Sequence, residues 1–90
     1  MEPPDFMKRI IDFNRLLDGE NRDSYHADDV SHWRAVYTDL VGFKEDLLGQ
    51  TREHLQQVPE TKRELAGIDI PFLEAELQRL RRGLDFWKSR

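Results

Sequence analysis

The sequence contains no cysteine and no long apolar run, and each absence excludes a class of protein. Without cysteine, the chain has no disulfide framework, no cysteine-based zinc site and no thiol nucleophile. No stretch approaches the roughly 20 apolar residues that cross a membrane, and the acidic, proline-containing start does not resemble a signal peptide. We therefore expect a cytoplasmic protein that does not associate with membranes.

Basic residues are also too few for general nucleic-acid binding. The chain has 14 Lys and Arg against 18 Asp and Glu, which gives a net charge of −4, whereas a basic surface normally supplies affinity for nucleic acid. The exception is the C-terminal stretch from Arg79 to Arg90. That stretch could bind an anion, but cations are also favoured near any helix C-terminus by the helix dipole. Nucleic acid is therefore not the expected partner.

Apolar residues recur at helical spacing along most of the chain. Ninety residues allow a single domain, 1–90, with one modest core. Near the start, Phe6, Ile10, Phe13 and Leu17 are spaced by 4, 3 and 4, which predicts an amphipathic helix over 3–18 that Gly19 can close. Residues 18–29 are polar and aperiodic, so we expect a linker there.

A second, long helix is predicted over 28–58. Asp28 or Asp29 is expected to cap its start, and Pro59 to end it. A break near Gly49 is the alternative, because a glycine inside a helix costs about 1 kcal/mol relative to alanine. The apolar seam predicted for this helix comprises Val30, Trp33, Tyr37, Leu40, Leu47 and Thr51, and the apolar residues alongside it are Val36, Phe43, Leu48, Leu55 and Val58.

A short helical turn over 59–66, which stops at Gly67, and a third helix over 70–88 complete the prediction. Asp69 is the expected N-cap of the third helix, with Ile68 and Leu73 as a hydrophobic staple and Pro71 in the first turn. Its seam is spaced by 4, 3, 4 and 3, which is coiled-coil-like, and comprises Leu73, Leu77, Leu80, Leu84 and Trp87.

These elements predict an all-α fold, an antiparallel bundle in which the second and third helices form a coiled-coil-like hairpin. Antiparallel packing should bring Trp33 near Trp87, and Leu17 should reach the same layer. The same packing should place Asp28 and Asp29 near Lys88 and Arg90. The aromatic residues at this end could line a ligand pocket, but helical spacing more often indicates a core.

We find no catalytic constellation, so we expect no enzyme, no cofactor and no metal. The alternative is a metal-binding or metal-dependent helical-bundle enzyme that uses His26, Asp29 and His32. Asp29 and His32 form one D-x-x-H pair, whereas carboxylate-bridged di-iron bundles need two such pairs and further acids. A calcium loop is excluded, because Arg22 and Asp23 occupy places that require an oxygen ligand and a glycine.

The expected function is a small protein-interaction or dimerisation module, a regulatory subunit for example. The first helix is too short to cover the second, so part of the long helix should stay exposed, and exposed apolar surface usually meets a partner. A homodimer is the most common solution, and another protein is the alternative. The predicted partner-binding residues are Leu47, Thr51, Leu55, Val58, Arg79 and Arg82.

Overall fold

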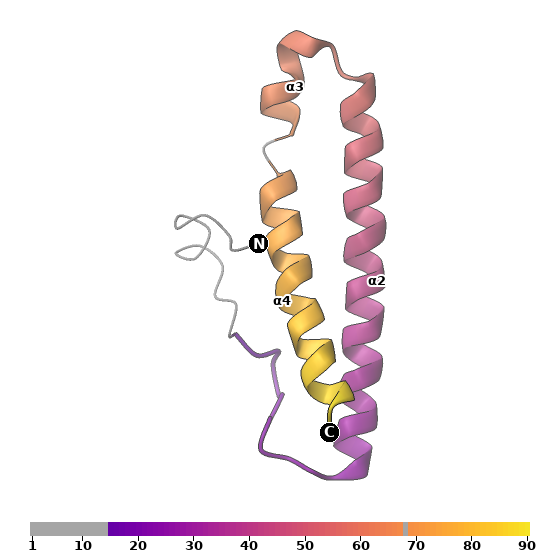
Figure 1. Ribbon diagram of the computed structural model, residues 1–90, viewed down its shortest axis with the longest axis vertical. Helices are drawn as coiled ribbons and strands as arrows, with labels where there is room; N and C mark the ends of the chain where they lie inside the picture. Colours follow the sequence, from indigo (N-terminus) through magenta and orange to yellow (C-terminus); the bar gives the residue numbers. More distant parts are fainter. Residues whose placement is uncertain (1–14, 68) are drawn as a thin grey trace.

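The computed structural model describes residues 15–67 and 69–90, and these form an all-α hairpin without strands. A polar segment leads into α2 (Ala27–Gln57), a short helix α3 (Glu60–Ala66) follows, and α4 (Ile70–Lys88) completes the fold. Figure 1 shows α4 running antiparallel to α2 along one of its sides, with α3 above α4 at the far end. The predicted all-α fold and the helical hairpin are therefore confirmed.

The 31-residue helix α2 is continuous through both of its glycines. A side chain at Gly42 or Gly49 would meet nothing within 4 Å. The predicted continuous helix is thus confirmed over the alternative break near Gly49. The helix ends because Val58 is extended and Pro59 disfavours helical backbone in the residue before it.

The start of α2 differs from the prediction. His26, not Asp28 or Asp29, is the N-cap, and its Nδ1 accepts a hydrogen bond of 3.2 Å from the backbone N–H of Asp28. The imidazole thereby satisfies one of the free amides of the first turn. The two aspartates lie inside that turn, where negative charge is favoured by the helix dipole.

The start of α4 also corrects one prediction. Asp69 occupies the N-cap position and Pro71 lies in the first turn, but Asp69 is helical and its side chain makes no capping hydrogen bond. Its backbone carbonyl instead accepts from the N–H of Leu73 at 3.0 Å. The predicted side-chain cap is therefore wrong, and the Ile68 half of the predicted staple lies outside the described residues.

The helix predicted over 3–18 falls mostly outside the described residues, which begin at Arg15. Residues 15–17 have no regular structure, and Asp18 and Gly19 form a turn, so the helix does not extend to 18 as predicted. Gly19 has a φ of 82°, a left-handed conformation that glycine adopts without strain.

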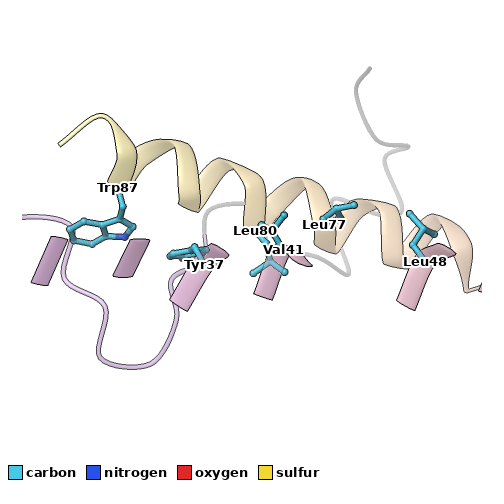
Figure 2. Close-up of a cluster of buried hydrophobic side chains, with 6 residues drawn as sticks. All are labelled: Tyr37, Val41, Leu48, Leu77, Leu80 and Trp87. Atoms are coloured by element: carbon cyan, nitrogen blue, oxygen red, sulfur yellow. The ribbon is translucent and has the colours of Figure 1, made fainter. Parts of the chain in front are cut away.

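The core lies between α2 and α4. Figure 2 shows Tyr37, Val41 and Leu48 from α2 facing three α4 side chains that complete the buried cluster, which are Leu77, Leu80 and Trp87. The α4 seam agrees with the prediction, because Leu73 and Leu84 also pack against this cluster.

The α2 seam agrees with the prediction as far as Tyr37 and differs from it beyond that residue. Val41 and Leu48 are buried, whereas the predicted Leu40 and Leu47 are only half-buried. Successive helical residues point about 100° apart, so Leu40 and Leu47 lie towards the side of α2, where Leu40 still packs against the core through one side.

Candidate functional site

The open end of the hairpin is closed by residues 15–26, which we call the strap. Figure 1 shows the strap descending beside α4 and passing beneath its C-terminal end to the start of α2. A local turn shapes it, because Asn21 accepts hydrogen bonds from the backbone N–H of Asp23 through its side chain and of Ser24 through its carbonyl. The strap thus joins both long helices at one end.

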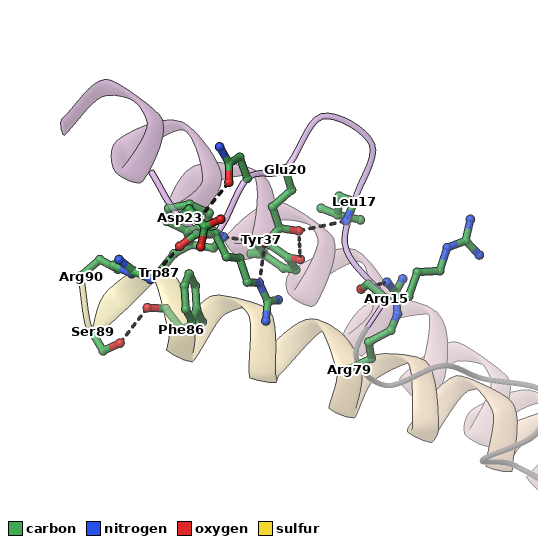
Figure 3. A network of polar contacts seen from close by, with 12 residues as sticks. Arg15, Leu17, Glu20, Asp23, Tyr37, Arg79, Phe86, Trp87, Ser89 and Arg90 are labelled. Atoms are coloured by element: carbon green, nitrogen blue, oxygen red, sulfur yellow. Dashed lines mark hydrogen bonds and ion pairs between the residues drawn. The ribbon is translucent and has the colours of Figure 1, made fainter. Parts of the chain in front are cut away.

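Glu20 holds the strap in place through a carboxylate that is fully buried at the side-chain level. Its Oε1 accepts hydrogen bonds from the Tyr37 hydroxyl at 2.6 Å and the Leu17 backbone N–H at 2.9 Å. Its Oε2 accepts from Trp87 Nε1 at 2.7 Å and Arg22 Nε at 3.0 Å. Figure 3 shows Glu20 reaching from the strap into this polar cluster. One carboxylate therefore connects the strap, α2 and α4.

Hydrogen bonding outweighs desolvation at Glu20. Burial alone would raise the pKa of this carboxyl, but the bonds from Tyr37, Leu17, Trp87 and Arg22 lower its pKa below the ordinary value. Burial raises the pKa of Tyr37, and donation to the Glu20 carboxylate raises it further. Glu20 is therefore ionised and Tyr37 protonated at neutral pH. Among the described residues, no buried polar side-chain atom lacks a hydrogen-bond partner, so the cluster is complete within the chain.

The close approach of Tyr37 to α4 requires glycine at position 83. A Cβ on Gly83 would lie 2.2 Å from Cε1 of Tyr37, far inside van der Waals contact. The absence of a side chain lets the Tyr37 ring lie against the α4 backbone, with its hydroxyl at Glu20. Gly83 therefore belongs to the structure of the cluster.

Aromatic rings fill the same end. Trp33 and Trp87 stack with centroids 6.5 Å apart, which confirms the predicted meeting of the two tryptophans. Leu17 packs against the same core, also as predicted. Trp87 is completely buried and Phe86 meets it edge-on. These rings are thus core, not the lining of a pocket.

The predicted ion pairs of Asp28 and Asp29 with Lys88 and Arg90 do not form. Asp29 instead accepts a 2.6 Å hydrogen bond from the Ser24 hydroxyl. The Arg90 guanidinium lies over the rings of Tyr25 and Phe86 and donates to the carbonyl of Arg22. A cation gains more from aromatic faces and a carbonyl here than from an exposed ion pair, which contributes only about 0 to 1 kcal/mol.

The histidines weighed as metal ligands have other contacts. His26 caps α2, Asp29 bonds to Ser24, and His32 lies edge-on to Trp33 with centroids 4.8 Å apart. Within residues 15–67 and 69–90 there is no group of three or more His, Cys, Asp or Glu arranged to hold a metal ion. The structure does not bring His26, Asp29 and His32 together as a ligand set.

The two arginines predicted to bind a partner lie on α4. Arg79 is largely covered, with 14 % of its side chain exposed, and pairs with Glu76 at 3.0 Å. It also donates to the Arg15 carbonyl at 3.1 Å, so it anchors the strap. Arg82 is exposed. The contacts that the structure shows for Arg79 are therefore contacts within the chain.

The four predicted contact residues in the second half of α2 and at its C-cap are all half-buried, and they are Leu47, Thr51, Leu55 and Val58. Thr51 donates its hydroxyl to the Leu47 carbonyl one turn earlier. Leu55 faces the connection between α3 and α4, because a Cβ on Gly67 would lie 3.3 Å from its Cδ2. Leu55 thus points into the hairpin, whereas Leu47 lies on the side of α2.

Leu47 belongs to a longer apolar strip on α2 that does not face α4. We call this strip the Phe43 face, and it comprises Val36, Leu40, Phe43 and Leu47. The four residues follow one another at intervals of 4, 3 and 4, so they share one side of the helix. Phe43 is 62 % exposed, and the other three are half-buried.

Sequence reasoning missed Glu20 and the centre of the Phe43 face. Glu20 lies in a polar stretch without periodicity, and its only signal is indirect, since buried tyrosine and tryptophan need a polar partner. Phe43 was predicted to lie alongside the α2 seam, but the burial of Val41 and Leu48 in place of Leu40 and Leu47 leaves Phe43 exposed.

Comparison of the chain with protein-family models, curated proteins and solved structures gave no match. None of the helices in the described part of the chain is long and apolar enough to span a membrane.

Proposed function

We propose that this chain is a protein-interaction module that binds an amphipathic helix on the Phe43 face. The observation that carries the proposal is the 62 % exposure of Phe43 in the middle of a continuous helix, beside three half-buried aliphatic residues. A ring that the hairpin leaves in water gains free energy when a partner covers it, at roughly 25 cal/mol per Å² of apolar surface. Aromatic residues also dominate the binding energy of many interfaces.

The form of the hairpin supports this proposal. The strap and the Glu20 cluster hold one end of α2 and α4 together through contacts that do not involve the residues of the Phe43 face. Leu40 packs against the core through one side, which anchors the face to a rigid base. A binding surface on a fixed helix loses little conformational entropy when a partner docks.

A neutral designed peptide tests the proposal without favouring any charge on the partner. The peptide is an amphipathic helix with leucine along one face and glutamine along its flanks, and binding is measured by fluorescence anisotropy. We expect wild type and Tyr25→Ser to bind it equally, because Tyr25 is 78 % exposed but lies on the strap. Phe43→Ser should bind at least tenfold more weakly, since loss of a central aromatic contact costs about 2 kcal/mol or more.

Thermal unfolding provides the control for folding. Phe43→Ser should melt near the wild-type temperature, because substitution of an exposed residue usually changes stability by less than about 0.5 kcal/mol. Equal affinity of wild type and a folded Phe43→Ser for the peptide, or no binding at all, would overturn the proposed function.

A further inference from the structure

The outer edge of the Phe43 face is acidic. Asp39 and Asp46 precede and follow Phe43 by 4 and 3 residues, so both are its neighbours on the helix surface. Glu53 continues the same row at the next interval of 7. All three are exposed. Phe43 is therefore bordered by leucines on the side near α4 and by carboxylates on the side away from it.

These three carboxylates differ from the two acids that form ion pairs between α2 and α4. Glu45 pairs with Arg81, and Glu74 pairs with Arg52, on the opposite side of the hairpin interface. Among the described residues, no ion pair or hydrogen bond occupies Asp39, Asp46 or Glu53. Within residues 15–67 and 69–90, no cation is paired with this row of negative charge.

From this row we infer that the partner of the Phe43 face is a basic amphipathic helix of another protein, with an apolar strip flanked by lysine or arginine. The inference rests on the proposed function and names the chemistry of its partner. An apolar strip would cover Phe43 and Leu47, and basic residues along one flank would lie against Asp39 and Asp46. Charge complementarity of this kind selects partners and accelerates their association.

A second copy of the chain fits this face less well. In a symmetric antiparallel pair of α2 helices, each outer edge meets the same edge of its partner, so Asp39 and Asp46 would face the equivalent carboxylates. Like charges placed together across an interface oppose association. Arg79 of α4 offers little compensation, since it is already paired with Glu76 and donates to the Arg15 carbonyl.

Three peptides that share one apolar strip separate these possibilities. Their flanks are lysine, glutamine or glutamate, and each is titrated into the full chain by fluorescence anisotropy. We expect affinity to fall from lysine to glutamine to glutamate, with about fivefold between neighbouring peptides, as two partly exposed charge pairs would produce. The advantage of the lysine peptide should shrink as salt is raised.

A matched pair of variants locates the charge effect. Asp39→Asn combined with Asp46→Asn should reduce binding of the lysine peptide about fivefold and leave the glutamine peptide unchanged. Glu60→Gln combined with Glu64→Gln changes the net charge equally at exposed sites on α3 and should leave both unchanged. Equal loss in both double variants would show that only net charge matters, and would overturn the inference.

The remaining outcomes distinguish the inference from the proposed function. Equal binding of all three peptides, sensitive to Phe43→Ser, would contradict the basic partner but support the interaction module. A wild-type dimer in sedimentation velocity that Phe43→Ser dissociates would likewise replace the basic partner with a second copy. Affinity in the predicted order, from a protein that sediments as a monomer, would support both.

Discussion

The two ends of the hairpin are held together in different ways. At the strap end, Tyr37 and Trp87 are 1 % and 0 % exposed, and both donate to the carboxylate of Glu20. At the α3 end, Leu48 is the last fully buried α2 residue, and beyond it Thr51, Leu55 and Val58 are half-buried. The comparison indicates that stability is concentrated near the strap, while the middle of α2 presents a surface without weakening the fold.

Removal of Trp87 should produce the largest loss of stability. It should also remove the difference in stability between the two ends of the hairpin. Trp87→Ala deletes a completely buried ring, and such truncations cost about 3 to 5 kcal/mol, a large part of the stability of a small domain. Thermal and urea unfolding would measure the loss. Emission from Trp33, which stacks on Trp87, should change as well, and an unchanged melting temperature would show that this end is not the core.

Neutralisation of Glu20 should cause the next largest loss of stability, and the size of this loss should depend on pH. Glu20→Gln is expected to cost about 2 to 3 kcal/mol at pH 7, since hydrogen bonds to charged groups contribute about 1.5 to 3 kcal/mol. The pKa of Glu20 in the folded protein is lowered from 4.5. The wild-type carboxylate therefore makes its full contribution to the stability of the fold at pH values above 4.5. Its contribution disappears as the pH falls through the folded pKa.

Urea unfolding of wild type and Glu20→Gln at a series of pH values would check this sign. The two proteins should differ most near neutrality and converge in acid. The Asp23→Asn variant is the control, because Asp23 is exposed and lies in the same strap. A difference that grows as the pH falls would contradict the role of an ionised Glu20.

Two glycine substitutions should change the stability of the protein by smaller amounts and in opposite directions. Gly83→Ala would place a Cβ 2.2 Å from the Tyr37 ring and should destabilise by about 1 to 3 kcal/mol through overpacking. Gly42→Ala meets nothing within 4 Å and should stabilise α2 by about 1 kcal/mol through helix propensity. Melting temperatures that move in the same direction for both variants would refute the assigned packing.

The predictable part of this molecule is the part that depends on periodicity and chain breakers. Spacing of apolar residues located the α4 seam from Leu73 to Trp87, and Pro59 with Gly67 marked the short helix between the long ones. Antiparallel packing of two long helices then required Trp33 to meet Trp87. These features follow from local sequence because each depends on residues within one helix or on a short connection.

The rest depends on contacts that periodicity does not encode. The burial of Val41 and Leu48 in place of Leu40 and Leu47 depends on how α2 faces α4 across the interface, where Tyr37 lies against Gly83. The burial of Glu20 is decided by donors 17 and 67 residues away in the chain. The cap predictions were wrong for a similar reason. Asp28, Asp29 and Asp69 were predicted as caps from general residue preference, whereas the local backbone determines which side chain can accept.

Amide hydrogen exchange of the intact protein tests most directly the claim that stability is concentrated at the strap end. The account predicts the slowest exchange in α2 around Tyr37 and Val41 and in α4 around Leu80 to Trp87, with faster exchange from Thr51 to Gln57 and in α3, because local opening is easiest where few apolar groups are buried. Glu20→Gln should accelerate exchange at the strap end first. Uniform protection along both helices, or slower exchange at the α3 end, would contradict the account.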